Sequence, residues 1–213
     1  MSGMSRLIRS SFCRGIPTGI LRRMSDRRNT RDALLDATKE LTYTRGITGT
    51  GVDAIAARAG VTKRTLYQRF GSKDRLVTEA LGDRSRRALL SLESDARRRS
   101  EETGERVILA FFDVIETALR TKTKGGCAFI NASLEINIPG HPIREAALAH
   151  LRGREALVHQ LLVEAGVADA DLAAQVVLLV DGAYAVGGSR RDPAAARHAK
   201  AAAAALLASR GVS

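Results

Sequence analysis

Several residue types and patterns are scarce in this chain of 213 residues, and each shortage excludes a class of protein. There are only two cysteines, Cys13 and Cys127, which is too few for a disulfide framework and indicates a reduced, cytoplasmic protein. No stretch reaches the ~18 apolar residues of a membrane span. The longest apolar run, Leu172 to Val186, is interrupted by Gln175 and Asp181. We therefore expect no membrane partner.

The usual arrangements of catalytic and metal-binding residues are also missing from the sequence. It contains no glycine-rich phosphate loop, no nucleophile elbow and no pair of carboxylates spaced for catalysis. Its histidines do not cluster: His141, His150 and His159 are nine residues apart, which puts successive ones on opposite faces of a helix. We therefore predict that the chain is not an enzyme, and that it has no metal site and no cofactor.

Acidic residues are absent from residues 1–25, which carry five arginines and thus a charge of +5. Residues 26–75 carry eleven Lys and Arg against six Asp and Glu, again +5, so that the rest of the chain supplies only +1 of the total of +11. A basic excess confined to one part of a chain indicates a docking surface for a polyanion. This distribution favours nucleic acid over a membrane surface as the partner.

Residues 1–25 show no apolar periodicity and allow two interpretations. They are either a disordered basic extension, which could follow DNA phosphates or the minor groove, or a stretch upstream of a true translation start at Met24. Under either interpretation we expect that residues 1–23 are not needed for folding.

Two short helical patterns meet at Gly60, a position suited to a left-handed backbone that ends one helix and turns the chain. Thr50 is a candidate N-cap for the first helix. The apolar face of that helix recurs at i, i+3, i+4 and i+7 and consists of Val52, Ile55, Ala56 and Ala59. After the glycine, Val61 would fill the space under the turn, and Thr62 is the expected N-cap of the second helix.

The second helix has two inward anchors, Leu66 and Phe70, and an outer surface suited to phosphates and base edges. Ser72 is the expected cap of a further helix, with Lys73 in its first turn. The side chains left for the outer face and the ends of the second helix are Lys63, Arg64, Thr65, Tyr67, Gln68 and Arg69. Two short helices joined by a glycine turn, the second basic and polar outside, predict a helix-turn-helix.

The segment Gly60–Leu76, GVTKRTLYQRFGSKDRL, resembles the recognition-helix signature of the TetR family of bacterial transcriptional repressors. The similarity is strong from about Arg31 to Leu81 and weaker beyond. It implies that Lys63, Arg64 and Thr65 face bases, and that Tyr67, Arg69 and Lys73 contact phosphates. The resemblance also implies that Thr50 opens a helix that touches the DNA backbone, whereas Gly51 stands where the family often has a hydroxyl residue.

The remaining periodicity predicts an all-α chain of about nine helices. We expect a helix-turn-helix DNA-binding domain at residues 26–71, with its first helix at 30–44, and an effector-binding and dimerisation domain at 72–213. Helices are expected at 72–99, 105–121, 127–136, 142–165, 169–186, with Gly187-Gly188 as its end, and 193–211. Leu76, Ala80, Leu89, Leu90 and Leu92 are the expected inward positions of the first of these.

Within the second domain, Gly125–Glu135 is similar to a segment that lies beside the effector cavity in one branch of the family. We place five residues near such a cavity, Phe111, Phe112, Ile115, Phe129 and Asn131, with Tyr184 as a further candidate. Apolar residues at helical spacing more often belong to an ordinary core. Cys127 stands at a helix N-terminus, where the helix dipole would favour its thiolate.

The alanine-rich segment from Ala194 to Ala208 would allow helices to approach closely. The resemblance implies that the last two helices form a homodimer, that the dimer binds a palindromic operator in double-stranded DNA, and that a small-molecule effector releases it. Two alternatives stay open: a regulator triggered by thiol chemistry at Cys127, and an activator.

Overall fold

The computed structural model describes residues 18–121 and 126–211, and all regular secondary structure within these ranges is helical. Residues 1–17 of the expected extension, and residues 122–125, lie outside the described residues. The all-α prediction and the order of the helices are confirmed. The helices are α1 (Thr18–Arg45), α2 (Val52–Arg58), α3 (Lys63–Phe70), α4 (Lys73–Thr103), α5 (Val107–Thr121), α6 (Ala128–Glu135), α7 (Pro142–Glu164), α8 (Ala170–Arg190) and α9 (Ala194–Ser209).

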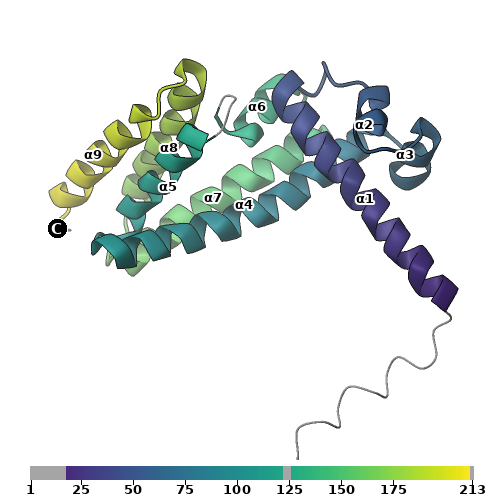
Figure 1. Cartoon of the computed structure of the whole chain (residues 1–213). Helices are drawn as coiled ribbons and strands as arrows, with labels where there is room; N and C mark the ends of the chain where they lie inside the picture. The colour runs from purple at the N-terminus through teal and green to yellow at the C-terminus, as the bar shows by residue number, and fades with distance from the viewer. Residues whose placement is uncertain (1–17, 122–125, 212–213) are drawn as a thin grey trace, which may run out of the picture.

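Two hydrophobic cores divide the molecule along the long helix α4. The smaller core joins α1, α2, α3 and the first turns of α4, and Leu34, Leu66 and Leu76 are completely buried in it. The larger core joins the rest of α4 to helices α5 to α9. Figure 1 shows α4 and α7 running side by side between α1–α3 at one end and α5, α8 and α9 at the other. A movement of α4 would therefore displace residues at both ends of the molecule.

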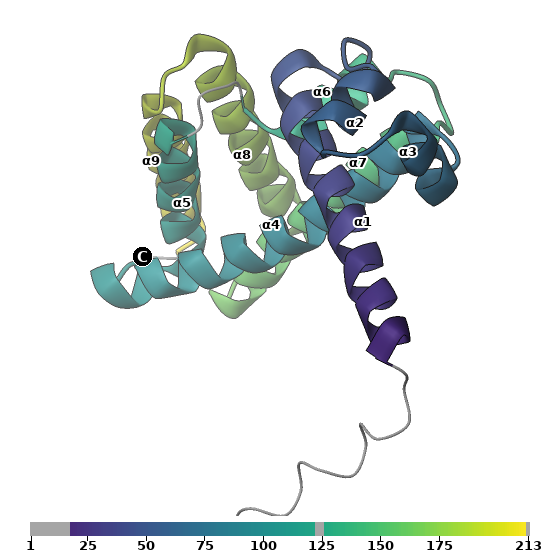
Figure 2. The same cartoon turned by 45° about the vertical axis from the view of Figure 1, so that its right-hand side comes forward.

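Helix α1 begins earlier than the sequence indicated, at Thr18 and not at Thr30. Residues 18–25 are thus helical where a disordered extension was expected. The physical reason is that no proline occurs between Pro17 and Gly46, so that nothing in this stretch forces a helix to begin at Thr30. Both views show the first turns of α1 projecting away from the rest of the molecule (Figure 2).

Helix α8 continues through Gly187 and Gly188, which were expected to end it. Both glycines are buried, and a Cβ atom on Gly187 would lie 2.5 Å from Leu119 Cδ1 and 3.2 Å from the carbonyl oxygen of Asp192. Gly187 therefore serves close packing against α5, and neither glycine breaks the helix. One inward position of α4 was also wrong, since Leu90 is 71% exposed.

By length and composition alone, α8 is apolar enough to cross a membrane. In the described structure it packs against α9 and α7, and its buried residues Leu172, Val176 and Val180 belong to the larger core. Its apolar composition is explained by this position in the protein interior.

Replacing Gly187 by alanine is expected to destabilise the fold by about 1–3 kcal/mol, because the added methyl group overpacks the contact with Leu119. Gly182 in the same helix has no atom within 4 Å of the corresponding position, so Gly182→Ala is the matched control. Alanine is the better helix former, and the control is expected to be neutral or stabilising by up to about 1 kcal/mol. Urea unfolding of the two variants measures the difference, and equal midpoints would refute the packing role of Gly187.

Candidate nucleic-acid interface and ligand cavity

Helix α2 presents its apolar face to α1 and α3, as the spacing predicted. Ile55 and Ala56 are buried, and Val52 and Ala59 pack against the same core. Gly60 has a φ of +68°, which is the left-handed conformation expected of the turn residue. The backbone N–H of Val61 donates to the carbonyl of Ala56, and this bond closes the turn.

Helix α3 is capped and anchored as predicted. Thr62 is its N-cap, and the hydroxyl of Thr62 accepts a hydrogen bond from the backbone N–H of Thr65 at 3.1 Å. Leu66 and Phe70 are buried and fix the inner face. The outer face is exposed except for the half-buried Thr65, and it carries Lys63, Arg64, Tyr67, Gln68 and Arg69. Lys63 is the only one of these for which an ion pair is described, with Asp53 at 3.1 Å.

Two of the residues expected to contact DNA make hydrogen bonds within the protein. Thr50 does not cap α2, whose N-cap is Gly51; its buried hydroxyl donates to the carbonyl of Gly46 at 2.6 Å and lies 3.2 Å from that of Leu41. The Thr50 hydroxyl is thus directed inward, toward carbonyls near and just after the C-terminal end of α1. The ammonium of Lys73 donates to the carbonyl of Ile47 at 2.6 Å and is thus engaged within the protein.

The turn between α1 and α2 is attached to helix α6 by the carboxylate of Glu135, the last residue of α6. This carboxylate accepts from the backbone N–H groups of Ile47 at 2.9 Å and Thr48 at 2.8 Å, and from the Thr48 hydroxyl at 2.5 Å. Partial burial opposes ionisation, but these hydrogen bonds and the charge of Lys73 outweigh it and lower the pKa of Glu135. A side chain on Gly46 would come within 3.0 Å of the same carboxylate.

The side chain of Ile47 belongs to the larger core and not to the core of α1–α3. The turn that precedes α2 and α3 is therefore joined to the helices of the larger core by apolar packing and by hydrogen bonds.

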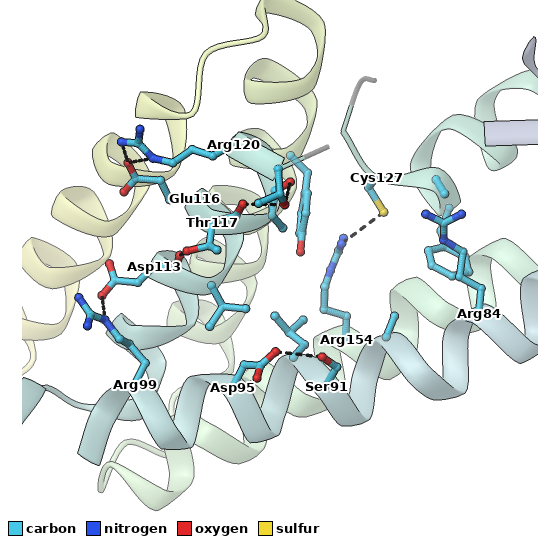
Figure 3. A pocket seen from close by; sticks show the side chains of 18 of the residues that line it. Arg84, Ser91, Asp95, Arg99, Asp113, Glu116, Thr117, Arg120, Cys127 and Arg154 are labelled. Carbon is cyan, nitrogen blue, oxygen red and sulfur yellow. Dashed lines mark hydrogen bonds and ion pairs between the residues drawn. The ribbon is translucent and has the colours of Figure 1, made fainter. Parts of the chain in front are cut away.

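A cavity of about 780 Å³ lies between α4, α5, α6 and α7 (Figure 3). Its more exposed part is lined by charged residues of α4 and α5, among them Asp95, Arg99 and Arg120. Its buried end is lined by Cys127, Phe129, His150, Arg154 and Tyr184. The size and the mixture of apolar and polar groups suit a small organic ligand.

Arg154 is the most unusual residue at the buried end, because it is 2% exposed. Its guanidinium pairs with Asp181, lies 5.2 Å from the centre of the Tyr184 ring, and donates to the Cys127 sulfur at 3.7 Å. Burial raises the pKa of Tyr184, so that this phenol is neutral. Figure 3 shows Arg154 directed at Cys127 across the cavity.

His150 stacks on Phe129, with ring centres 3.5 Å apart, and its Nδ1 is 3.0 Å from the Ser85 hydroxyl. Burial, and then the charges of Arg154 and Arg84, lower the pKa of His150 to about 3. The imidazole is therefore neutral at physiological pH and acts as a flat polar wall of the cavity.

Among the five residues expected near the cavity, the structure places only Phe129 in its lining. Phe111, Phe112 and Ile115 are completely buried in the larger core, because the apolar face of α5 packs against its helical neighbours and leaves its polar face to the cavity. Asn131 lines a separate cavity of about 250 Å³ between α1, α4 and α6.

Comparison with known proteins agrees with this arrangement. A sequence model described as "Bacterial regulatory proteins, tetR family" matches residues 34–80. The crystal structure of a TetR transcriptional regulator from Streptomyces avermitilis MA-4680 is 30% identical, covers 86% of this chain and 99% of its own length, and has a TM-score of 0.74. This chain belongs to the TetR family. It is a DNA-binding transcriptional regulator and not an enzyme.

Two curated relatives of this TetR-family chain are also regulators. YjdC of Escherichia coli K12, named an HTH-type transcriptional regulator, is 27% identical over 158 residues, which are 71% of this chain and 80% of YjdC. FasR of Mycolicibacterium smegmatis, named an HTH-type transcriptional activator, is 40% identical over 89 residues, which are 40% of each chain. The family resemblance stated from the recognition-helix segment is confirmed.

Sequence reasoning missed Arg154, His150 and Arg84 as cavity residues. A signal for two of them was present: His150 and Arg154 occupy the same helical positions as the buried residues Ile143, Ala147 and Leu161 of α7. Polar residues on the buried face of an amphipathic helix require partners, and they mark a site more specifically than the phenylalanines of α5.

We expect Glu135→Gln to lower the free energy of unfolding at pH 7 by about 1 kcal/mol, because an amide cannot accept all three hydrogen bonds. The pKa of Glu135 is lowered by folding, so its contribution is present above its ordinary pKa of 4.5 and is lost as the pH falls through the lowered value. Urea unfolding of both proteins should therefore show a difference that shrinks on acidification below 4.5. A difference that does not depend on pH would contradict the role of the carboxylate.

Proposed function

We propose that the protein is a homodimeric repressor that binds a palindromic operator in the cytoplasm and is released by a small molecule in the cavity. The observation that carries the proposal is that α6 contributes Cys127 and Phe129 to the cavity and holds the DNA-reading turn through Glu135. A ligand that displaces α6 would thus act directly on the turn that precedes α2 and the recognition helix α3.

DNA recognition is assigned to α3. Lys63, Arg64 and Thr65 stand in its first turn, where the recognition helix of a helix-turn-helix meets base edges. Tyr67 and Arg69 follow on exposed positions and are proposed to contact phosphates, with Gln68 between them and Thr62 at the helix start. Lys73 and Thr50 are instead proposed to support the turn between α1 and α2 from within.

Dimerisation is assigned to α8 and α9, which pack against each other. Leu178 of α8 is 71% exposed and Val186 is 38% exposed, while α9 exposes small residues such as Ala201 and Ala205. Exposed apolar residues on two helices that pack together support a self-complementary contact. A two-fold dimer would hold its recognition helices ~34–36 Å apart to meet two half-sites.

Arg64→Ala is expected to weaken operator binding by about 1–3 kcal/mol and to relax the base preference at one position of each half-site. Arg69→Ala is the matched comparison: loss of a phosphate contact should weaken binding to all sequences alike and reduce the salt dependence by about one counterion. Fluorescence anisotropy with single-base operator variants at several salt concentrations distinguishes the two. The assignment fails if both variants change the base preference, or if both change only the salt dependence.

Ligand-driven release requires that operator and ligand weaken each other by the same factor, typically 5–150-fold. The measurement is a reciprocal titration: operator affinity with saturating effector, and effector affinity with saturating operator. Equal effector affinity with and without operator would exclude ligand-driven release.

A second candidate trigger is thiol chemistry at Cys127, whose sulfur lines the cavity and accepts a hydrogen bond from Arg154. A group attached to this sulfur would occupy the cavity beside the N-terminus of α6. Operator binding before and after alkylation, in the wild type and in Cys127→Ser, tests this candidate. A third possibility is activation, which is supported by the description of FasR as an activator. Expression from a promoter fusion, measured with and without the protein, shows whether the protein raises or lowers transcription.

A further inference from the structure

The buried end of the cavity carries more positive than negative charge. Arg154 lies at this end and Arg84 lines the same cavity, and among the described residues the carboxylate paired with Arg154 is Asp181. For Arg84, the described interactions are a 3.5 Å contact with the Lys39 carbonyl and a position 4.8 Å from the centre of the Tyr43 ring, with no carboxylate. Two guanidinium groups with one carboxylate leave a surplus of about one positive charge.

The carboxylates at the more exposed part of the cavity do not compensate this surplus, because each has its own cation. Asp95 pairs with Arg98 at 2.8 Å, Glu102 with Arg99 at 3.4 Å, and Glu116 with Arg120 at 2.6 Å. Asp113 accepts from Lys200 at 2.8 Å. The charged groups of α4 and α5 are thus neutralised locally, and the buried end remains positive.

Arg154 also has unused hydrogen-bonding capacity. Its side chain is 98% buried, yet its Nε atom has no hydrogen-bond partner. A buried N–H without a partner is costly unless a bound molecule satisfies it. The neighbouring groups offer little: His150 is uncharged, and the Cys127 sulfur is a weak acceptor at 3.7 Å.

Resting on the ligand-responsive function proposed above, we propose that this end of the cavity is an anion site, in which Arg154 and Arg84 bind the carboxylate of a small organic acid. The planar fork of a guanidinium matches a carboxylate in two parallel hydrogen bonds. A monoanion would neutralise the surplus charge, whereas the dianion of a phosphate ester would leave a buried negative charge. Ala88, Leu92, Val114 and Phe129 line the space next to it and would contact an apolar body.

The first experiment compares acids with uncharged analogues of the same shape. Isothermal titration of the full chain uses benzoate against benzamide, octanoate against octanamide, and phenyl phosphate as the dianion. The acids are expected to bind at least about tenfold more tightly than their amides, the ratio that one charge-assisted hydrogen bond produces. Amides that bind as tightly as the acids, or phenyl phosphate binding more tightly than benzoate, would overturn the proposal.

Substitutions then locate the site. Arg84→Met removes one cation without leaving a carboxylate unpaired, and Arg154→Met combined with Asp181→Asn removes a neutral pair together. Each is expected to weaken binding of the acids about tenfold or more and to leave the amides unchanged. Arg98→Met, which removes a cation from the exposed part of the cavity, is the matched control and should have no effect. Unchanged binding of the acids to Arg84→Met and to the double variant would refute the assignment.

Cys127 provides an independent reporter of the same site. Iodoacetate and iodoacetamide both transfer a two-carbon group to a thiolate with loss of iodide, but only iodoacetate carries a carboxylate. We expect the ratio of their rates at Cys127 to exceed the ratio at the same residue in the urea-unfolded chain by about tenfold, and to fall to the unfolded value in Arg84→Met. Equal ratios, or no labelling together with no binding of any acid, would exclude the anion site.

Failure of the anion site and failure of ligand-driven release are distinguishable. If the acids bind and the substitutions abolish binding, but operator affinity is unaffected, the anion site stands and the release mechanism is wrong. If neutral compounds release the operator and acids do not bind, release stands and the anion site is wrong.

Discussion

The three hydrogen bonds accepted by the Glu135 carboxylate connect the two halves of this regulator. Their donors, the backbone of Ile47 and Thr48 and the Thr48 hydroxyl, lie in the turn between α1 and α2, immediately before the DNA-reading helices. Lys73, at the start of α4, donates to the Ile47 carbonyl from the same side. The orientation of α2 and α3 relative to the second domain thus depends on where one short helix places its last residue.

Helix α6 has eight residues and meets a different constraint at each end. At its N-terminus, Cys127 contacts the buried Arg154 in the cavity; at its C-terminus, Glu135 holds the turn. A helix of this length is short enough to shift as a unit, since it is held mainly by α7 and by these end contacts. A ligand that shifts α6 would therefore change the orientation of α2 and α3 without rearranging the rest of the larger core.

The helix-turn-helix was predictable because the sequence signals that specify it are local. The caps Thr62 and Ser72, the left-handed Gly60 and the anchors Leu66 and Phe70 each follow from short-range backbone chemistry, and the structure confirms all of them. The cavity was not predictable in the same way. Phe111 and Phe112 have the spacing of an apolar face, but spacing does not tell a core from a cavity wall, which depends on which helices pack on which side.

Tertiary contacts also decided the errors at Thr50 and Gly187. A threonine before a helix is a reasonable cap, but the Thr50 hydroxyl instead donates to the carbonyl of Gly46, directly after α1. A pair of glycines suggests a helix end, but close packing against Leu119 requires glycine within α8. In both cases the deciding partner is supplied by the packing of the folded chain and not by the local sequence.

The most direct test of the connection through Glu135 is the exchange rate of the backbone amide hydrogens of Ile47 and Thr48, measured by nuclear magnetic resonance at pH 7. In the wild type these amides should be protected by the carboxylate, and in Glu135→Gln they should exchange at least about tenfold faster. The amide of Thr65, which donates to Thr62, is the internal reference and should not change. Equal exchange rates of the Ile47 and Thr48 amides in the two proteins would show that Glu135 does not hold the turn between α1 and α2.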